Sequence, residues 1–280
     1  MIRSTVYEYP THLREAINDL PTSPGVYIFH GAQGDLPLYI GKSINIRNRV
    51  LSHLRTQDEA RMLRQTQRIS FIRCAGEIGA LLLEASLIKQ QHPLFNQKLR
   101  RTKQMCSLTL QDGKPVVVYS RDIDFATQTG LFGLFSSRQS ALEKIRDFAD
   151  EHRLCLGLLG LEKNKAGKPC FRSMINRCAG ACSAREPLED HQRRLVAALN
   201  SIKVICWPYA GAIGLIERHP DMTQIHVVQN WCYLGSTTDM DQARALTTQA
   251  SGFDADGYKI LCRPLLADDT EIVELCSSQV

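Results

Sequence analysis

The chain has 280 residues, of which 44% are hydrophobic and 22% are charged, a composition typical of a soluble globular protein. No apolar run reaches the roughly 20 residues that a membrane-spanning helix needs. The opening stretch, MIRSTVYEYP, has no apolar secretion signal, and ten cysteines in such a chain favour reduced thiols or metal ligands over disulfide bonds. We therefore expect a cytoplasmic protein without membrane contact, long enough for two domains.

The net charge of +5 is distributed unevenly along the chain. Between Gly41 and Lys103 the sequence carries 13 Lys and Arg against four Asp and Glu. Such a local excess indicates a polyanionic partner, with nucleic acid as the first candidate, although a solvated basic helix without any ligand has the same composition.

The stretch GVYIFHGAQGDLPLYIG, residues 25–41, predicts a β-hairpin. Its strands are expected at 26–29 and 38–40, where β-branched and aromatic residues are bounded by turn-forming residues. Tyr27 and Tyr39 each stand two positions from a glycine, near the ends of the hairpin. On a small sheet such tyrosines are ordinary packing residues unless neighbouring segments supply chemistry.

Residues 42–55 predict a helix with two different faces. Ile46, Val50 and Leu54 form an apolar stripe at a spacing of four. A polar stripe on the other face consists of Lys42, Asn45, Arg49 and His53. Because spacings of three and four stack side chains along one side of a helix, this stripe is expected to lie directly beneath Tyr39.

A later predicted helix, residues 77–91, carries a carboxylate on its apolar side. The neighbours of Glu84 three and four positions away are Ala80, Leu81, Leu87 and Ile88. Burying a carboxylate is costly unless it is paired or binds a metal; the alternative is a head group that reaches water from the edge of the apolar sector. His92–Pro93 ends this helix, and Asn96 follows in a loop or short strand.

The rest of the chain predicts a strand-rich module, a cysteine-dense segment and a C-terminal sheet. Residues 106–150 contain a strand pair, a third strand and a helix. The cysteines that follow are spaced C-x14-C-x7-C-x3-C, at Cys155, Cys170, Cys178 and Cys182. After a helix from 187 to 200, an antiparallel sheet with one helix is expected, with strand-like stretches at 202–207, 212–219, 223–236 and 258–266. The isolated cysteines of this part are interpreted as core residues: Cys206, Cys232, Cys262 and Cys276.

The first hundred residues resemble the GIY-YIG endonuclease family. The pattern is matched by GVY at 25–27, YIGK at 39–42, Arg49 in the next helix, Glu84 in a later helix and Asn96 after its end. The segments TSPGVYIF, YIGKSINIRNRV, LLLEASLIKQQHPLFN and CFRSMINRCAGAC are similar to the N-terminal half of the UvrC excision-repair nuclease, and most of all to the Cho-type excinucleases, stand-alone homologues of that half. The resemblance covers about residues 20–185.

With this resemblance, the predicted fold class is α/β (α+β), with a short antiparallel or mixed sheet flanked by helices in the nuclease domain. The expected segments are an N-terminal lead-in (1–22), a GIY-YIG nuclease domain (23–102), a small ββα module (103–150), a cysteine-cluster segment (151–186) and a C-terminal α+β domain with an antiparallel sheet (187–280).

The resemblance implies hydrolysis of a phosphodiester with a divalent cation. Glu84 would ligate Mg²⁺ (or Mn²⁺), which suits a site with one carboxylate, and Arg49 would bind a non-bridging phosphate oxygen. Tyr39 is the implied general base. Since a phenol with a pKa near 10 is a poor base at neutral pH, Lys42 is expected to lower the pKa of Tyr39.

Three further residues have supporting roles by resemblance. Tyr27 would hydrogen-bond the attacking water or Tyr39, and Asn96 would position its neighbours, as would Asn45. His53 occupies the place where family members carry a His or Tyr near the water.

The four clustered cysteines have three interpretations. Their spacing is not that of a zinc ribbon, which shows two close C-x2-4-C pairs, whereas iron–sulfur clusters tolerate looser spacing. The resemblance favours a [4Fe–4S] cluster on Cys155, Cys170, Cys178 and Cys182. Zinc and uncoordinated thiols remain as alternatives.

These observations predict a metal-dependent DNA endonuclease of nucleotide excision repair. It would cut damaged double-stranded DNA on the 3′ side of a lesion after recruitment by damage-recognition proteins of the UvrA/UvrB type. One alternative is a DNA-binding iron–sulfur redox sensor on an inactive nuclease scaffold; retention of Tyr39, Arg49 and Glu84 argues against it. The other is a homing or restriction endonuclease, which would need a sequence-reading module that the chain does not show.

Overall fold

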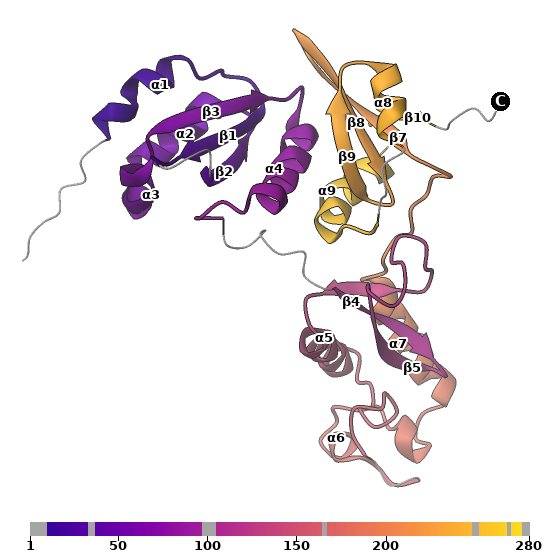
Figure 1. Cartoon of the computed structure of the whole chain (residues 1–280). Coiled ribbons are helices and arrows are strands. Elements are labelled where there is room, and N and C mark those ends of the chain that lie inside the picture. The colour runs from indigo at the N-terminus through magenta and orange to yellow at the C-terminus, as the bar shows by residue number, and fades with distance from the viewer. Residues whose placement is uncertain are drawn as a thin grey trace, which may run out of the picture. The chain divides into compact units, whose positions relative to one another are not determined.

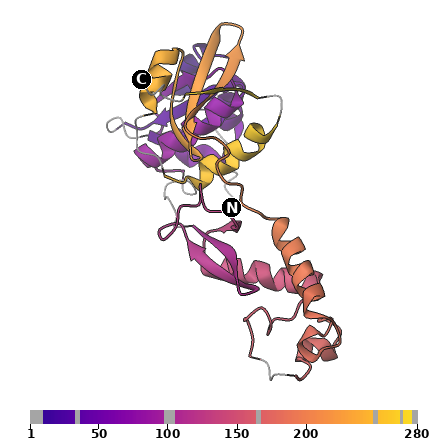
Figure 2. The same cartoon turned by 90° about the vertical axis from the view of Figure 1, so that its right-hand side faces the viewer.

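The computed structural model describes residues 10–32, 37–96, 105–163, 167–247, 252–267 and 270–275. The chain divides into two compact units (Figure 1). The first unit combines residues 1–102 with 209–280, and the second contains residues 103–208. The two ends of the chain therefore share one unit, and in Figure 2 the orange and yellow C-terminal elements stand in front of the indigo and magenta N-terminal ones. No helix among the described residues combines the length and apolar character needed to cross a bilayer.

The nuclease part of the first unit is built on a three-stranded antiparallel sheet in the order β2-β1-β3. Its strands are β1 (Gly25–His30), β2 (Pro37–Ser43) and β3 (Arg68–Arg73). The hairpin predicted from the sequence is confirmed: Ile28 pairs with Ile40 across β1 and β2. Because β2 is an edge strand, one side of its backbone is available to other parts of the chain.

Helices cover both faces of this sheet. They are the short η1 (Thr11–Leu13) and α1 (Arg14–Asn18), then α2 (Ile46–Arg55), η2 (Gln57–Glu59), α3 (Ala60–Gln65) and α4 (Glu77–Gln91). Alternation along β1 sends Tyr27 and Phe29 into one core with α2, while Val26 and Ile28 face Ile88 of α4 on the other side. The sheet thus separates the helix that carries Arg49 and His53 from the helix that carries Glu84.

The predicted start of α2 is wrong by one turn. The helix begins at Ile46 because Asn45 caps it, its side-chain oxygen accepting from the Asn48 N–H at 3.0 Å. Lys42 is therefore not on the helix but in β2, opposite Val26 of β1.

The C-terminal part of the first unit is a four-stranded antiparallel sheet in the order β10-β7-β8-β9. Its elements are β7 (Ile213–His219), β8 (Met222–Gln229), β9 (Cys232–Thr237), α8 (Met240–Leu246), α9 (Ala255–Leu266) and β10 (Glu271–Glu274). Its largest fully buried side chain is Trp231. The Trp231 and Tyr258 rings pack edge to face, with their centroids 4.9 Å apart.

Two strand predictions in this part of the sequence are wrong. Residues 258–266 lie in α9, capped by the Asp254 carboxylate, because Gly257, Leu261 and Leu265 recur every four residues on one buried face. The stretch 202–207 forms only a single bridge, from Lys203 to Phe132. The cysteines expected in this core are half-buried at Cys206, Cys232 and Cys262, and Cys276 lies outside the described residues.

The second unit packs a three-stranded sheet in the order β5-β4-β6 against two long helices. Its elements are β4 (Cys106–Gln111), β5 (Lys114–Tyr119), β6 (Phe132–Phe135), α5 (Arg138–Glu151), α6 (Phe171–Met174), η3 (Ala181–Ser183) and α7 (Leu188–Asn200). The predicted ββ(β)α arrangement of residues 106–150 is present in this unit.

Helix α7 differs from its predicted place in the C-terminal domain. Leu195, Ala198 and Leu199 of α7 pack in the same core as Leu108 of β4 and Ile145 of α5. The apolar stripe of α7 thus closes the core of the second unit, and the boundary expected at residue 187 falls instead near residue 208.

Candidate active site

The two hairpin tyrosines come together on the face of the sheet that α2 covers. The ring centroids of Tyr27 and Tyr39 are 6.2 Å apart. The imidazole centroid of His53, in the last turn of α2, lies 5.3 Å from the centroid of the first ring and 5.5 Å from that of the second. Tyr27 is 1% exposed, whereas Tyr39 is half-buried and therefore accessible to a substrate.

The glycine that follows Tyr39 and Ile40 leaves room for this arrangement. A Cβ atom at Gly41 would lie 2.2 Å from the Tyr27 hydroxyl oxygen and 2.8 Å from the ring of Tyr39. Any side chain at this position would displace both phenols. The glycine in the YIG motif is thus explained by the close approach of the two tyrosines.

A chain of hydrogen bonds runs from Tyr27 through His53 to Glu59. The Tyr27 hydroxyl lies 2.6 Å from Nε2 of His53, and Nδ1 of His53 contacts the Glu59 carboxylate. Since an ionised carboxylate only accepts, Nδ1 carries the hydrogen and Nε2 accepts from Tyr27. His53 is 3% exposed, so it is not on a solvent-facing polar stripe, and its burial lowers its pKa despite the opposing effect of Glu59.

Glu59 was missed by the sequence prediction. It lies in η2, six residues beyond His53, after Thr56 has ended α2. The only signal in the sequence is that Glu59 is one of four acidic residues in the basic stretch from Gly41 to Lys103. Helical spacing could not place it beside His53, because the contact depends on the break between α2 and η2.

Glu84 reaches the site around the edge of β2. Its Oε1 accepts from the backbone N–H of Lys42 at 3.0 Å. Asn96 binds the same edge: its side chain accepts from Ile40 N at 2.9 Å and donates to Ile40 O at 2.8 Å. These contacts satisfy backbone groups that an edge strand would otherwise expose, and they fix the strand that carries Tyr39.

The carboxylate of Glu84 is largely buried, as its apolar helical neighbours indicated. Burial raises the pKa of Glu84 above its ordinary value, and the N–H of Lys42 and the charges of Lys42 and Arg49 offset only part of this effect. A largely buried carboxylate near the Tyr39 phenol fits the oxygen-rich surroundings that a hard divalent cation prefers. Glu84 would be the protein ligand.

Lys42 does not lower the pKa of Tyr39, so this part of the sequence analysis is wrong. Tyr39 and Lys42 stand three apart in β2, so their side chains point to opposite faces of the sheet. The Lys42 ammonium instead pairs with Glu77 of α4 at 2.5 Å. Burial, followed by the negative charge of Glu84, raises the pKa of Tyr39; the positive charge of Arg49 acts in the lowering direction but does not prevail.

Arg49 is exposed at the entrance to this cluster. Its guanidinium hydrogen-bonds to the Tyr27 phenol. The burial of Tyr27 is the main reason that the pKa of this phenol is raised, while Arg49 acts in the lowering direction. Arg49 thus connects the buried hydrogen bonds to the surface where a phosphate group could bind.

A second cluster of functional groups lies in the second unit. The sulfur atoms of Cys155, Cys170, Cys178 and Cys182 all lie within 4.8 Å of one another. The sulfurs of Cys155 and Cys170 are 3.9 Å apart, close to the roughly 3.8 Å edge of a tetrahedron with metal–sulfur bonds of about 2.3 Å. All nine described cysteines are free thiols, so these four can act as metal ligands.

The sequence matches three protein families in succession. The UvrC-like GIY-YIG domain matches residues 23–97, the UvrC/Cho excinuclease middle domain matches 90–201, and the excinuclease Cho C-terminal domain matches 212–279. The first match defines the class to which the hairpin and its tyrosines belong: a GIY-YIG nuclease, which cleaves phosphodiesters.

Individual relatives extend this result over nearly the whole chain. Excinuclease Cho of Escherichia coli strain K12 is 56% identical over 272 residues, which cover 97% of this chain and 92% of that protein. UvrABC system protein C of Moorella thermoacetica is 31% identical over 193 residues, 64% of this chain and 30% of that protein. The chain therefore belongs to the Cho excinuclease family.

One solved structure similar to this chain is the GIY-YIG N-terminal endonuclease domain of UvrC from Thermotoga maritima, bound to its catalytic divalent cation, magnesium. It is 36% identical, and the match covers 30% of this chain and 94% of that domain with a TM-score of 0.28.

Proposed function

We propose that this excision-repair nuclease cuts damaged double-stranded DNA on the 3′ side of a lesion, with Mg²⁺ or Mn²⁺, after recruitment by damage-recognition proteins of the UvrA/UvrB type. The observation that carries the proposal is the convergence of Tyr27, Tyr39, Arg49 and His53 with the Glu84 carboxylate at the edge of β2. The family relationship to excinuclease Cho supports the repair context.

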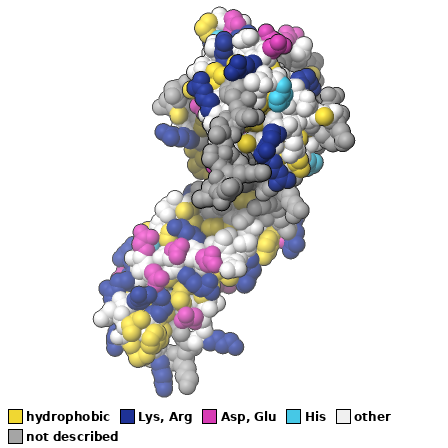
Figure 3. All heavy atoms as spheres, turned by 90° about the vertical axis from the view of Figure 1, so that its left-hand side faces the viewer, with side chains coloured by type: hydrophobic (Ala, Val, Ile, Leu, Met, Phe, Trp, Pro, Cys, Tyr) yellow, Lys and Arg dark blue, Asp and Glu magenta, His cyan; other side chains and the backbone are white. Residues whose placement is uncertain are grey.

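The DNA backbone is bound, in this proposal, by the basic surface around Arg49. The guanidinium of Arg49 is exposed, and further exposed arginines follow at the end of α2 and along α3: Arg55, Arg61 and Arg64. Lys and Arg side chains are spread over the face of the first unit seen in Figure 3, where acidic side chains gather near the upper edge. Contacts of this kind bind phosphates without reading the base sequence.

The attacking water gives its proton to Tyr39 in the proposed mechanism. The pKa of both phenols is raised, so neither serves as a phenolate at neutral pH. Instead, Tyr39 accepts the proton while its own hydroxyl proton passes to Tyr27, and the proton of Tyr27 passes to Nε2 of His53. Both phenols stay neutral, and Glu59 stabilises the resulting imidazolium.

The chemical balance of the step is a simple hydrolysis. The water oxygen forms a bond to phosphorus, and the bond between phosphorus and the 3′ oxygen breaks. The 3′ oxygen takes a proton from solvent, His53 returns its proton to solvent, and Arg49 stabilises charge on a non-bridging oxygen. A divalent cation, when bound by Glu84, supplies Lewis-acid stabilisation of the developing charge on the phosphoryl group and the leaving oxygen. Asn96 keeps β2, and with it Tyr39, in place through Ile40.

The four clustered cysteines are proposed to hold a metal centre. The resemblance to UvrC favours a [4Fe–4S] cluster, while the separation between the sulfurs of Cys155 and Cys170 is also that of a single tetrahedral ion such as Zn²⁺. In either case the centre would hold together the segments of the second unit that carry Cys155, Cys170, Cys178 and Cys182.

The test is incision of a duplex with one defined lesion, in the presence of Mg²⁺ and the damage-recognition proteins. The damaged strand is labelled at its 5′ end so that the cut can be mapped. Wild type should cut on the 3′ side of the lesion, and Glu84→Ala and Arg49→Ala should cut at least about 100-fold more slowly, since each removes stabilisation of the transition state. Equal cutting by all three proteins would contradict the site, and a cut on the 5′ side would contradict the proposed position.

A further inference from the structure

Helix α4, which carries Glu84, has no capping side chain in its own segment. Its N-cap residue is Gly76, in an extended conformation, so the first N–H groups of the helix need partners from elsewhere. The partner is Glu217 of β7: its Oε1 accepts from Ile78 N at 3.0 Å and its Oε2 from Gly79 N at 2.7 Å. These second and third N–H groups are the ones that a capping side chain normally binds.

Two glycines make this contact possible. A Cβ atom at Gly76 would lie 2.2 Å from Oε1 of Glu217, so the carboxylate occupies the space that an ordinary capping side chain would fill. A Cβ atom at Gly79 would lie 2.3 Å from Cε1 of His226 on β8. The first turn of α4 is therefore shaped to receive the C-terminal sheet.

Glu217 is itself held by its neighbours in that sheet. Nε2 of His226 lies 3.0 Å from Oε2 of Glu217, and Nδ1 of His226 lies 2.6 Å from the hydroxyl of Ser236 on β9. Burial alone would raise the pKa of Glu217, but the hydrogen bonds from His226, Gly79 and Ile78 outweigh it and leave the pKa below its ordinary value. Glu217 is thus an anion at the positive end of the helix dipole.

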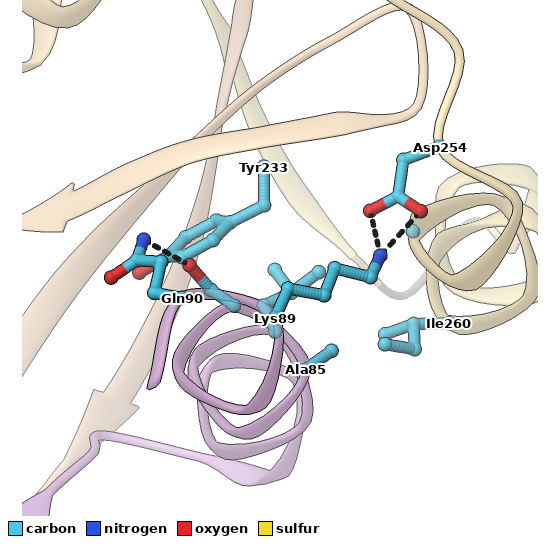
Figure 4. Close-up of a pocket in the computed structure, with 9 residues that line it drawn as sticks. Ala85, Lys89, Gln90, Tyr233, Asp254 and Ile260 are labelled. Atoms are coloured by element: carbon cyan, nitrogen blue, oxygen red, sulfur yellow. Dashed lines mark hydrogen bonds and ion pairs between the residues drawn. The ribbon is translucent and has the colours of Figure 1, made fainter. Parts of the chain in front are cut away.

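The other end of α4 is attached to the same C-terminal part. Lys89, in the last turn, binds the Asp254 carboxylate at 2.6 Å and that of Asp256 at 3.1 Å. Figure 4 shows Lys89 extended from α4 toward Asp254, beside a hollow of about 210 Å³ that Tyr233 and Ile260 also line. Glu84 lies between the two attachments, five residues beyond Gly79, and faces the nuclease sheet.

We propose that Glu217, supported by His226, is a positioning residue for Glu84. The C-terminal sheet caps α4 from outside the nuclease domain, so it fixes the orientation of the helix and hence the carboxylate at the edge of β2. Loss of the cap would let the first turns of α4 shift and would weaken cation binding at Glu84 without removing a group that touches DNA. The inference rests on the proposed role of Glu84 as the cation ligand.

The experiment compares Glu217→Ala and Glu217→Gln with wild type in the full chain. Asp221→Asn is the matched control. The carboxylate of Asp221 also joins the C-terminal part to the nuclease part, with its oxygen 2.6 Å from the guanidinium of Arg73, but this ion pair is exposed and lies away from α4. Amide hydrogen exchange at Ile78 and Gly79 reports on the cap independently of activity. Incision is then measured against Mg²⁺ concentration and, separately, against DNA concentration.

Glu217→Ala should speed exchange at both amides and raise the half-saturating Mg²⁺ concentration about 10-fold, as loss of a group that orients a metal ligand typically does. Excess Mg²⁺ should restore most of the rate, and the DNA concentration dependence should not move. Glu217→Gln keeps one acceptor oxygen, so it should increase the exchange rate and the half-saturating Mg²⁺ concentration by less than Glu217→Ala does. Asp221→Asn should leave both the exchange and the Mg²⁺ dependence at wild-type values.

Two results would overturn the proposal. Wild-type exchange at Ile78 and Gly79 in folded Glu217→Ala would show that the cap is not made. Faster exchange with an unchanged Mg²⁺ dependence would show that the cap is structural only. Failure of the proposed function gives a different pattern: Glu84→Ala would then cut normally while the amides still respond to Glu217→Ala.

Discussion

The hydroxyl of Tyr27 lies 2.6 Å from Nε2 of His53, although the two residues stand 26 positions apart on different elements. This contact joins the hairpin to α2 and extends to Glu59, so the buried tyrosine has a path for its proton. In the proposed mechanism, this path lets a site whose phenols both have a raised pKa remove a proton from water near neutral pH.

Glu59→Gln should lower kcat about 100-fold, which is within the range that general-base catalysis contributes. Glutamine can still accept from Nδ1 of His53, so the tautomer is kept, but the charge that stabilises the imidazolium is lost. Single-turnover incision at saturating DNA and Mg²⁺ measures the effect, with Asp58→Asn as the control because Asp58 is exposed on the same turn. An unchanged kcat would mean that His53 does not receive the proton.

Lys42→Met should leave the alkaline limb of the pH–rate profile in place. The Lys42 ammonium pairs with Glu77, and it is not among the main groups that set the pKa of Tyr39. Its charge does help to lower the pKa of Glu84, so the acid limb of the profile should move to higher pH. A shift of the alkaline limb instead would restore the role that the sequence alone suggested for Lys42.

Glu84→Gln should stabilise the cation-free protein at pH 8 while it abolishes cutting. Because the folded pKa of Glu84 is raised, its contribution to stability is fully present below its ordinary value of 4.5 and is lost as pH rises through the folded pKa. The melting temperature of Glu84→Gln in EDTA should therefore exceed that of wild type at pH 8, and the difference should vanish below pH 4.5. Glu15→Gln, which replaces an exposed carboxylate on α1, serves as the control. A higher melting temperature for wild type than for Glu84→Gln at pH 8 would show that burying the ionised Glu84 carboxylate does not destabilise the protein.

Cys170→Ser should release most of the metal bound to the second unit and lower its melting temperature. Cys170 is buried and its sulfur lies within 4.8 Å of the three other sulfurs, so its loss removes one of the four ligands. Elemental analysis after anaerobic purification distinguishes iron from zinc, and Cys206→Ser, outside the cluster, is the control. Wild-type protein with neither metal would contradict a metal centre.

Much of the nuclease domain could be predicted because its signals are local. The alternation in β1, the turn residues of the hairpin and the uninterrupted helix from Glu77 to Gln91 depend on neighbours in sequence. The misplacement of Lys42 has a local cause too: Asn45 was counted as a member of a helical face, although its side chain caps the helix.

Other features depend on distant contacts and could not be predicted in this way. An apolar run such as residues 258–266 fits either a buried strand or a helix, and the Asp254 cap decides in favour of α9. The same holds for α7, whose apolar stripe gives no indication of which core it will enter. Glu59 and Glu217 act across breaks or between domains, where sequence spacing carries no information.

The contact of Gly79 with His226 bears on how this nuclease domain can be recombined. Because a Cβ atom at Gly79 would lie only 2.3 Å from the imidazole, a side chain at position 79 requires a smaller residue at position 226 or a shift of the helix. A chimera that joins residues 23–97 to an unrelated partner would leave α4 without its cap, even if every residue around Tyr39 were retained. In this chain, the helix that carries Glu84 is therefore completed by a sheet that lies outside the segment with the catalytic motif.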